Sequence, residues 1–243
     1  MDCYTVFWRE MLVLKRTLWK FLATRLVGPV LYLIAFGWGL GRSIRTDGGS
    51  YLEFVLPGII ALSAMTVSFN ATGITLNMSR LYHKTLEEYL IAPISSFSFV
   101  LGKVLAGTVR GLLGALVILV LGFLFGARPL LCGWFFVVIF ATCFLFAALG
   151  VVAAMTVPSH EDMANFSTFV ILPMAFLCGT FFRAEQLPGI AADIVYALPL
   201  THSSYGLRAL AAGEGLPVLS LLVLAGYTAA FLAVAVWVIH RLR

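Results

Sequence analysis

The sequence is poor in charged residues. Only 11% of its 243 residues are charged, whereas 61% are hydrophobic, and a soluble domain usually carries about a quarter charged residues. A chain with this balance cannot cover a folded surface with polar groups. A soluble enzyme, a nucleic-acid module and a disordered protein are therefore poor interpretations, and the composition predicts a protein with several membrane spans.

Signals for disulfides, structural metals and secretion are also missing. The four cysteines are scattered without the spacing of a disulfide framework or a zinc site, which makes them small apolar filler. Charged residues interrupt the first 25 positions, and no apolar segment with a small-residue cleavage site follows them. We expect the chain to be inserted in a membrane rather than secreted.

Long apolar runs separated by charges are what the sequence has instead. A membrane-spanning helix needs about 20 mostly apolar residues. Six runs meet this condition when flanking residues are included, and they predict spans at residues 24–41, 53–78, 101–126, 133–157, 163–182 and 215–239. The predicted architecture is all-α, with six transmembrane helices in one domain over residues 1–243.

The distribution of basic residues predicts the orientation. Six spans place both termini on one side of the membrane. With both termini in the cytoplasm, eleven Lys and Arg residues lie inside and five outside. Cytoplasmic loops carry the excess of Lys and Arg, so we expect both ends in the cytoplasm of a bacterium and the spans in its inner membrane.

The segment at residues 4–22 has a helical pattern of a different kind. Apolar residues recur at steps of three and four, whereas Arg9, Arg16 and Lys20 fall together on the opposite side. This predicts a basic amphipathic helix at the cytoplasmic interface, where Trp8 and Trp19 suit the headgroup region and basic residues suit anionic lipid. Packing on another domain is the alternative.

The longest predicted cytoplasmic connection, residues 80–93, carries a short polar helix. Leu81, Thr85 and Glu88 share one helix face, and Pro93 ends the pattern. Such a helix projecting from two spans can dock a partner, and an ordinary solvated loop is the alternative.

The outer segment at residues 184–208 is too apolar for a free loop and too broken for a span. Pro188 and Pro199 interrupt helices there. We expect short re-entrant helices that cover the fifth and sixth spans.

One charge, Arg110, falls inside a predicted span. A charged side chain at the centre of a membrane helix costs about 3 kcal/mol on insertion scales, so it should face protein, water or headgroups. It either reaches the cytoplasmic interface or forms a salt bridge that steadies the preceding connection, with Glu87 or Glu88 as candidate partners.

Four stretches of the sequence resemble the membrane permeases of ABC-2 type exporters, in the branch of nodulation-factor, polysaccharide and drug export permeases. These stretches are residues 29–41, residues 51–58, Ala92-Pro93 with residues 101–103, and residues 172–182 with Leu187-Pro188, residues 199–202 and Arg208. Their order and spacing cover essentially the whole chain.

The resemblance implies the fold of type V exporters and a motor on another chain. Such permeases pair as homo- or heterodimers, and each half docks one cytoplasmic ATPase. The segment near residues 82–90 would be the coupling helix, braced by the N-terminal helix. The residues expected to couple it to the ATPase are Tyr82, Lys84, Thr85, Glu87, Glu88 and Tyr89.

The residues themselves agree that this chain does not bind ATP. The P-loop pattern GxxxxGK[ST] is absent, because Val104 follows Gly102-Lys103 and Phe97 stands at the first glycine position. We expect no catalytic, cofactor-binding or metal site on this chain, and ATP with magnesium on the partner.

Two further groups of residues are candidates for transport. Aromatic and amide side chains on the second and fifth spans could line the path, and the outer segment could gate it. The path candidates are Phe54, Phe69, Asn70, Phe166, Phe169 and Phe176. The gate candidates are Phe181, Phe182, Pro188, Pro199, His202 and Arg208.

The sequence departs from the family pattern at two positions. Arg183 stands where relatives usually have proline, and Asn70 stands where they often have glutamate. Because of both departures, the substrate of this protein is less securely inferred from the substrates of its relatives. An amphiphilic lipo-oligosaccharide or lipid-linked glycan is the expected cargo, with a drug or other small amphiphile as the alternative.

Two other classes of function fit the sequence less well. A stand-alone secondary transporter should carry more intramembrane charges and an inverted repeat, neither of which is evident. An intramembrane enzyme needs paired carboxylates, a histidine cluster or a nucleophile within the spans. Only His160, Glu161 and Asp162 come near this, and an ordinary solvated turn explains them.

Overall fold

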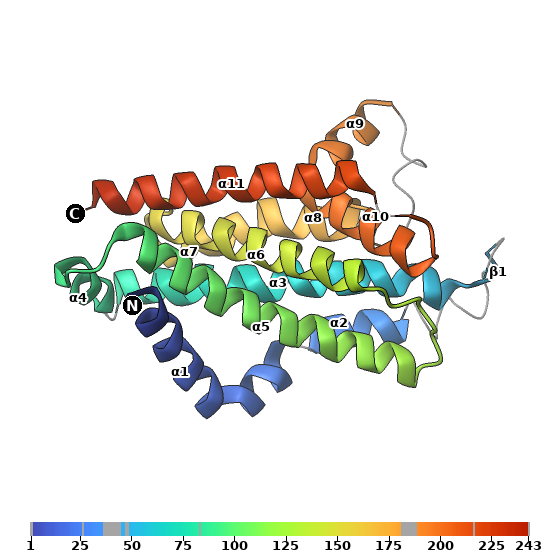
Figure 1. The fold of residues 1–243 in the computed structure, drawn as a ribbon, viewed down its shortest axis with the longest axis horizontal. Coiled ribbons are helices and arrows are strands. Elements are labelled where there is room, and N and C mark those ends of the chain that lie inside the picture. Colours follow the sequence, from blue (N-terminus) through green and yellow to red (C-terminus); the bar gives the residue numbers. More distant parts are fainter. Residues whose placement is uncertain are drawn as a thin grey trace.

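The core of the protein is a bundle of long helices. A computed structural model describes residues 2–25, 27–35, 45–46, 49–82, 84–180, 189–215 and 217–242. Within these residues four helices are long and apolar enough to cross a membrane: α3 (Tyr51–Leu81), α5 (Ser96–Leu124), α6 (Gly133–Thr156) and α11 (Val218–Arg241). They run side by side along the long axis of the molecule (Figure 1).

Shorter elements flank this bundle. The N-terminal helix α1 (Asp2–Arg25) lies obliquely to it and is followed by the short helix α2 (Val27–Tyr32) (Figure 1). The strands β1 (Arg45–Thr46) and β2 (Gly49–Ser50) pair as a two-stranded antiparallel ribbon. A short helix α4 (Thr85–Ile91) connects α3 and α5. After α6 come α7 (His160–Phe166), a π-helical turn (Ser167–Ile171), α8 (Leu172–Leu177), α9 (Gly189–Ala197) and α10 (Pro199–Ala211).

The all-helical membrane prediction is confirmed, and four of the six predicted spans correspond to the four long helices. The predicted first span, 24–41, falls partly outside the described residues. The predicted fifth span is divided into α7, the π turn and α8, which follow one another from His160 to Leu177. That stretch is about 27 Å long at 1.5 Å per residue, against a hydrocarbon core of about 30 Å.

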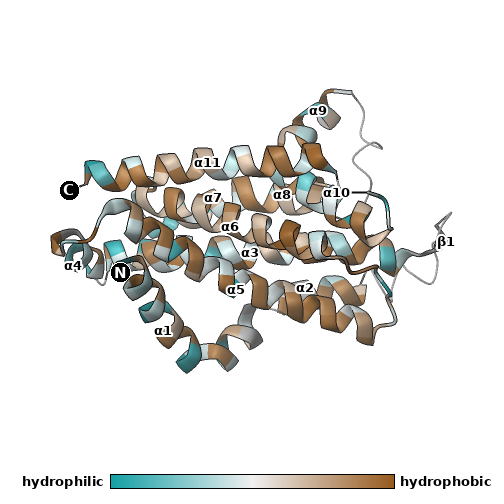
Figure 2. Ribbon diagram, viewed as in Figure 1, coloured by the Kyte–Doolittle hydropathy of each residue, from teal (hydrophilic) through white to brown (hydrophobic). Residues whose placement is uncertain are grey.

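The long helices differ in how much of their surface the rest of the chain buries. In α3, 83% of the most apolar stretch is buried inside the subunit, whereas the value for α11 is 17%. Apolar residues cover α5, α6 and α11 along most of their length, and polar residues gather on α1 and near the helix ends (Figure 2). Helix α3 is therefore the centre of the bundle, and most of the apolar surface of α11 is left uncovered by the rest of the chain.

Small residues allow α3 to lie close to both α5 and α6. A side chain at Gly107 would meet Thr72 of α3, and one at Gly111 would meet Ser68. On the other side, the Thr72 hydroxyl donates a 2.8 Å hydrogen bond to the Ala147 carbonyl of α6. Gly107 and Gly111, which are four residues apart and form a GxxxG pair, therefore serve close packing of helices within the chain. Such pairs are common where membrane helices lie close together.

The two ends of the bundle carry different elements. The N-terminus, the C-terminus and α4 lie at one end, whereas the β ribbon, α9 and α10 lie at the other (Figure 1). Both termini are thus on the same side of the bundle, as an even number of spans requires.

We expect Gly150→Ala to destabilise the bundle. The added methyl group would lie 2.8 Å from the Phe69 carbonyl oxygen and 2.9 Å from the Gly73 nitrogen, so α3 and α6 would have to separate. Overpacking of this kind costs about 1–3 kcal/mol. Thermal unfolding in detergent would measure the loss.

Gly226→Ala on α11 is the matched control, because no atom lies within 4 Å of its added methyl group. It should leave the melting temperature unchanged or raise it slightly, since alanine favours a helix over glycine. Equal melting temperatures for Gly150→Ala and the wild type would contradict the close packing of α3 on α6.

Candidate functional site

The short helix α4 is set apart from its neighbours by local backbone signals. Lys84, just before it, has a left-handed backbone with φ of 51°. Ala92, which precedes Pro93, is extended, as residues before proline tend to be. The Ser95 hydroxyl then accepts the Ser98 backbone N–H and caps α5. Helix α4 is thus a separate element held between two chain reversals.

One face of α4 is anchored and the other is exposed. Leu86 is 4% exposed and belongs to an apolar cluster that includes Val6, Leu76 and Phe99. Glu87 and Glu88 are exposed, and 86% of Ile91 is exposed. The free face therefore presents two carboxylates beside an apolar side chain.

Tyr89 connects α4 to the N-terminal helix and to α5. The Arg9 guanidinium donates a hydrogen bond to the Tyr89 hydroxyl and lies 5.1 Å from the centre of its ring. The Tyr89 ring packs against Phe99, with centroids 5.0 Å apart, and the Lys103 ammonium lies 5.2 Å from the same ring. The bond with Tyr89 raises the pKa of Arg9.

Contacts from α3 hold the other side of α4. Thr85 and Ser79 share a hydrogen bond between their hydroxyl groups. Arg80, in the last turn of α3, donates to the carbonyl oxygens of Ala154 at 3.1 Å and Met155 at 2.7 Å. Those carbonyls lie at the C-terminal end of α6, where backbone acceptors lack partners within their own helix. The ends of α3 and α6 and the start of α4 are thereby tied together.

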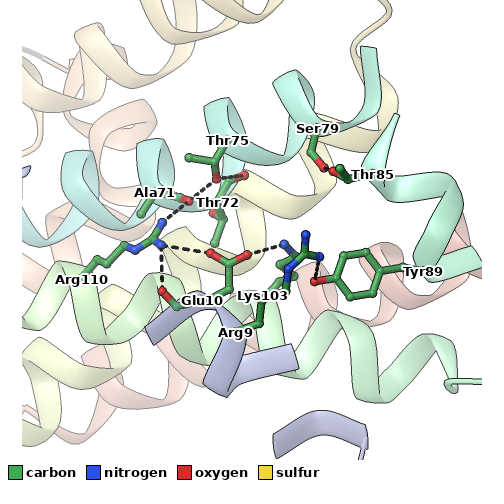
Figure 3. A network of polar contacts seen from close by, with 10 residues as sticks. All are labelled: Arg9, Glu10, Ala71, Thr72, Thr75, Ser79, Thr85, Tyr89, Lys103 and Arg110. Atoms are coloured by element: carbon green, nitrogen blue, oxygen red, sulfur yellow. Dashed lines mark hydrogen bonds and ion pairs between the residues drawn. The ribbon is translucent and has the colours of Figure 1, made fainter. Parts of the chain in front are cut away.

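A cluster of ion pairs lies next to this region (Figure 3). The Glu10 carboxylate of α1 accepts a 2.6 Å contact from Lys103 and a 3.0 Å contact from Arg110, both on α5. The side chains of Glu10, Lys103 and Arg110 are 17%, 12% and 9% exposed. Arg110 also donates to the Ala71 carbonyl of α3 at 3.4 Å.

The charges in this cluster determine the ionisation of Glu10. Burial alone would raise the pKa of the Glu10 carboxyl group. The neighbouring Lys103 and Arg110 outweigh burial and hold that pKa below its ordinary value. Glu10 is therefore ionised at neutral pH and compensates part of the buried positive charge.

The structure corrects the expected partner of Arg110. Glu87 and Glu88 are exposed on α4, and Arg110 pairs with Glu10 instead. Reasoning from sequence overlooked Glu10, although one signal was present: it lies on the same helical face as Phe7 and Leu14, a carboxylate within an apolar stripe.

Helix α1 packs on the protein through one narrow apolar face and leaves the rest of its surface exposed. Val6 and Leu14 are buried against the protein. Tyr4, Trp8 and Trp19, which were predicted on the apolar face or in the headgroup region, are 64%, 52% and 85% exposed. The basic residues Lys15, Arg16 and Lys20 are exposed as well. The helix therefore uses one apolar stripe for packing and leaves these aromatic and basic residues uncovered. On the helical wheel, Lys15 lies between Tyr4 and Trp8, and Arg16 and Lys20 lie further round.

At the opposite end of the bundle, Arg208 of α10 is a second polar centre. It donates to the Gly179 carbonyl at 2.6 Å and to the Phe54 carbonyl at 3.2 Å, and its guanidinium lies 3.9 Å from the Phe54 ring centre. His202 contacts the Tyr196 carbonyl of α9 at 2.9 Å, and Pro199 begins α10. The gate candidates Phe181, Phe182 and Pro188 lie outside the described residues.

The path candidates are dispersed. Phe69 is fully buried and stacks on Phe166, with centroids 5.8 Å apart. Phe54 belongs to the Arg208 contact, Asn70 is half-buried, and Phe169 is 77% exposed. Phe176 is 40% exposed and meets the edge of Tyr32. The described part of one subunit does not gather these side chains around one cavity.

Similar proteins identify the family. Residues 1–211 match the family model for the ABC-2 type transporter. The chain belongs to the ABC-2 type transporter family. It is 32% identical over 222 residues to Nodulation protein J of Rhizobium meliloti, covering 86% of this chain and 80% of the relative. Nodulation protein J of Rhizobium leguminosarum is 34% identical, covering 80% and 76%.

A further relative is the inner membrane transport permease YadH of Escherichia coli, which is 28% identical over 190 residues and covers 75% of this chain and 73% of the relative. Together with the long apolar helices, these similarities establish an ABC-2 membrane permease of the exporter type.

Among the described residues, no group of three or more histidine, cysteine or acidic side chains could hold a metal ion.

The lowered pKa of Glu10 predicts how stability depends on pH. A carboxyl whose pKa is depressed in the folded state stabilises that state above its ordinary pKa of about 4.3, and this contribution is lost as pH falls through the folded-state value. We expect Glu10→Gln to lower the melting temperature in detergent at pH 7, and this difference from the wild type to shrink at acidic pH.

Glu161→Gln on α7 is the control, because this exposed carboxylate lies outside the cluster. Its difference from the wild type should be small across the same pH range. A Glu10→Gln profile that runs parallel to the wild-type profile would contradict a stabilising role for the ionised carboxylate.

Proposed function

We propose that this permease exports an amphiphilic substrate from the cytoplasmic side, driven by a separate cytoplasmic ATPase. The geometry of α4 is the main observation that supports this proposal. Its inner face is fixed by Leu86, Thr85 and Tyr89, whereas Glu87, Glu88 and Ile91 are exposed at the end of the bundle that holds both termini. A rigid helix with a mixed acidic and apolar free face suits docking to another protein.

The other elements of the proposal follow from the family and from charge. The subunit works as a dimer, with ATP and magnesium on the ATPase. It lies in the bacterial inner membrane with both termini in the cytoplasm, where α1 meets the leaflet. The exposed aromatic and basic residues of α1 support this placement, because interfacial helices combine such residues.

The proposed cargo is a lipo-oligosaccharide or a lipid-linked glycan. Support comes from the relatives named Nodulation protein J and from the resemblance to nodulation-factor and polysaccharide permeases. Drugs and other small amphiphiles are the alternative, because the same branch includes drug exporters. Arg183 and Asn70 depart from the family pattern, so the cargo need not be that of either relative.

Purification in a mild detergent from the native membrane tests the motor. We expect an ATPase with a P-loop motif to co-purify in stoichiometric amount and to hydrolyse ATP. Reversing Glu87 and Glu88 to Lys should abolish recovery of the ATPase, because both charges lie on the docking face. Glu161→Lys, an exposed reversal on α7, is the control and should retain the partner. Recovery of the permease alone across several detergents would favour a stand-alone secondary transporter.

The cargo can be tested on the purified complex in lipid vesicles. We expect lipo-oligosaccharides to stimulate ATP hydrolysis more strongly than cationic amphiphiles at equal concentration. Stronger stimulation by the cationic amphiphiles would favour drug export. An ATP hydrolysis rate that neither compound changes would contradict the proposed substrate class. It would not affect the conclusion on the ATPase, which the co-purification tests separately.

A further inference from the structure

We propose that Glu10 is a positioning residue that transmits movement of α4 to the long helix α5. This inference rests on the proposed function and deepens it. The route begins at the Tyr89 hydroxyl on α4, passes through Arg9 and Glu10 of α1, and ends at Lys103 and Arg110 on α5 (Figure 3).

The covalent connection between α4 and α5 is poorly suited to this task. Residues 92–95 between the two helices are not helical, and they include Pro93. A non-helical connection of this kind transmits a pull or a twist less well than a continuous helix. The Tyr89 ring also packs directly on Phe99, near the start of α5. A displacement of α4 therefore needs a further connection to reach the deeper part of α5 that holds Arg110.

Adjacent residues of α1 supply that connection. Arg9 holds Tyr89, and the next residue, Glu10, holds Lys103 at 2.6 Å and Arg110 at 3.0 Å. Because Arg9 and Glu10 are consecutive in one helix, a displacement of one side chain carries the other with it. The two partners of Glu10 are two helical turns apart on α5, so a single carboxylate restrains both the position and the rotation of that helix.

The packing around the route is tight enough to carry force. Val6 of α1 is buried, and a methyl group at Gly102 of α5 would lie 2.8 Å from its Cβ atom. Lys103 also faces the rings of Tyr89 and Phe99, at 5.2 and 5.8 Å. Arg110 reaches about 21 Å along α5 from Ser96, at 1.5 Å per residue. The route therefore enters the apolar part of the span.

The cluster is also sensitive to the loss of one charge. Lys103 and Arg110 are largely buried, and Glu10 is the acidic group paired with them in the described part of the chain. Removing one member of a buried ion pair leaves an uncompensated charge. Neutralising Glu10 should thus release α1 from α5 while leaving the exposed face of α4 in place for the ATPase.

The test uses the complete complex of permease and ATPase in lipid vesicles. Spin labels are placed at Val120→Cys on α5 and Leu222→Cys on α11, both exposed positions, after the native cysteines are replaced by serine. Electron–electron resonance then compares the nucleotide-free complex with the complex trapped by ADP and vanadate. This readout needs no substrate, and vanadate trapping separately reports engagement of the ATPase.

We expect the wild type to shift its α5–α11 distance on trapping. Glu10→Gln should trap vanadate as well as the wild type, while the shifted population falls about five-fold or more. Glu10→Lys should show the same defect, whereas Glu10→Asp should retain most of the shift, because it keeps the negative charge beside Lys103 and Arg110. Glu161→Gln should behave as the wild type.

Several results would overturn the inference. These are an unaltered shift in Glu10→Gln, loss of vanadate trapping together with the shift, a defect in Glu10→Asp as large as that in Glu10→Gln, or no shift in the wild type. If Glu10→Gln does not assemble, Arg9→Leu removes both the hydrogen bond and the ring contact with Tyr89 at the other end of the route. A normal shift in that variant would equally contradict the route. A wild-type complex that recruits no ATPase would instead overturn the proposed function.

Discussion

The structure depends on a buried charge that must be compensated. Arg110 lies within an apolar helix, where an unpaired guanidinium costs several kcal/mol. Its partner comes from outside the long-helix bundle, because Glu10 belongs to the N-terminal helix. This requirement fixes α1 against α5, and the neighbouring Arg9 then fixes α4 against α1. The end of the bundle that holds α1 and α4 is thus organised by the electrostatics of a residue within a long apolar helix.

The remainder of the subunit is held by close contacts between helices rather than by ions. Glycines on α5 and α6 face hydroxyl-bearing residues of α3, and Thr72 bonds directly to the α6 backbone. Such packing brings backbones together where lipid offers no hydrophobic driving force. At the far end, Arg208 ties α10 to the first turn of α3 and to the turn after α8. The two polar centres therefore lie at opposite ends of a densely packed bundle.

Much of this arrangement could be predicted from the sequence, because apolar length and charge placement are local properties. The long helices, the amphipathic α1, and the short α4 before Pro93 follow from such patterns. The partner of Arg110 could not be predicted in this way. Glu10 is 100 residues away in sequence, and its pairing depends on how α1 packs on α5. The burial of Phe69 and the exposure of Phe169 likewise depend on tertiary packing that periodicity alone does not determine.

The central claim is that α1, α4 and the N-terminal half of α5 act as one unit on which an ATPase docks. The most direct test is an electron cryomicroscopy structure of the permease purified with its ATPase in a lipid nanodisc. The claim predicts that the ATPase contacts Glu87, Glu88 and Ile91 on α4, and that Glu10 still bridges Lys103 and Arg110. An ATPase bound elsewhere, or an α1 separated from α5 in the assembled complex, would contradict it.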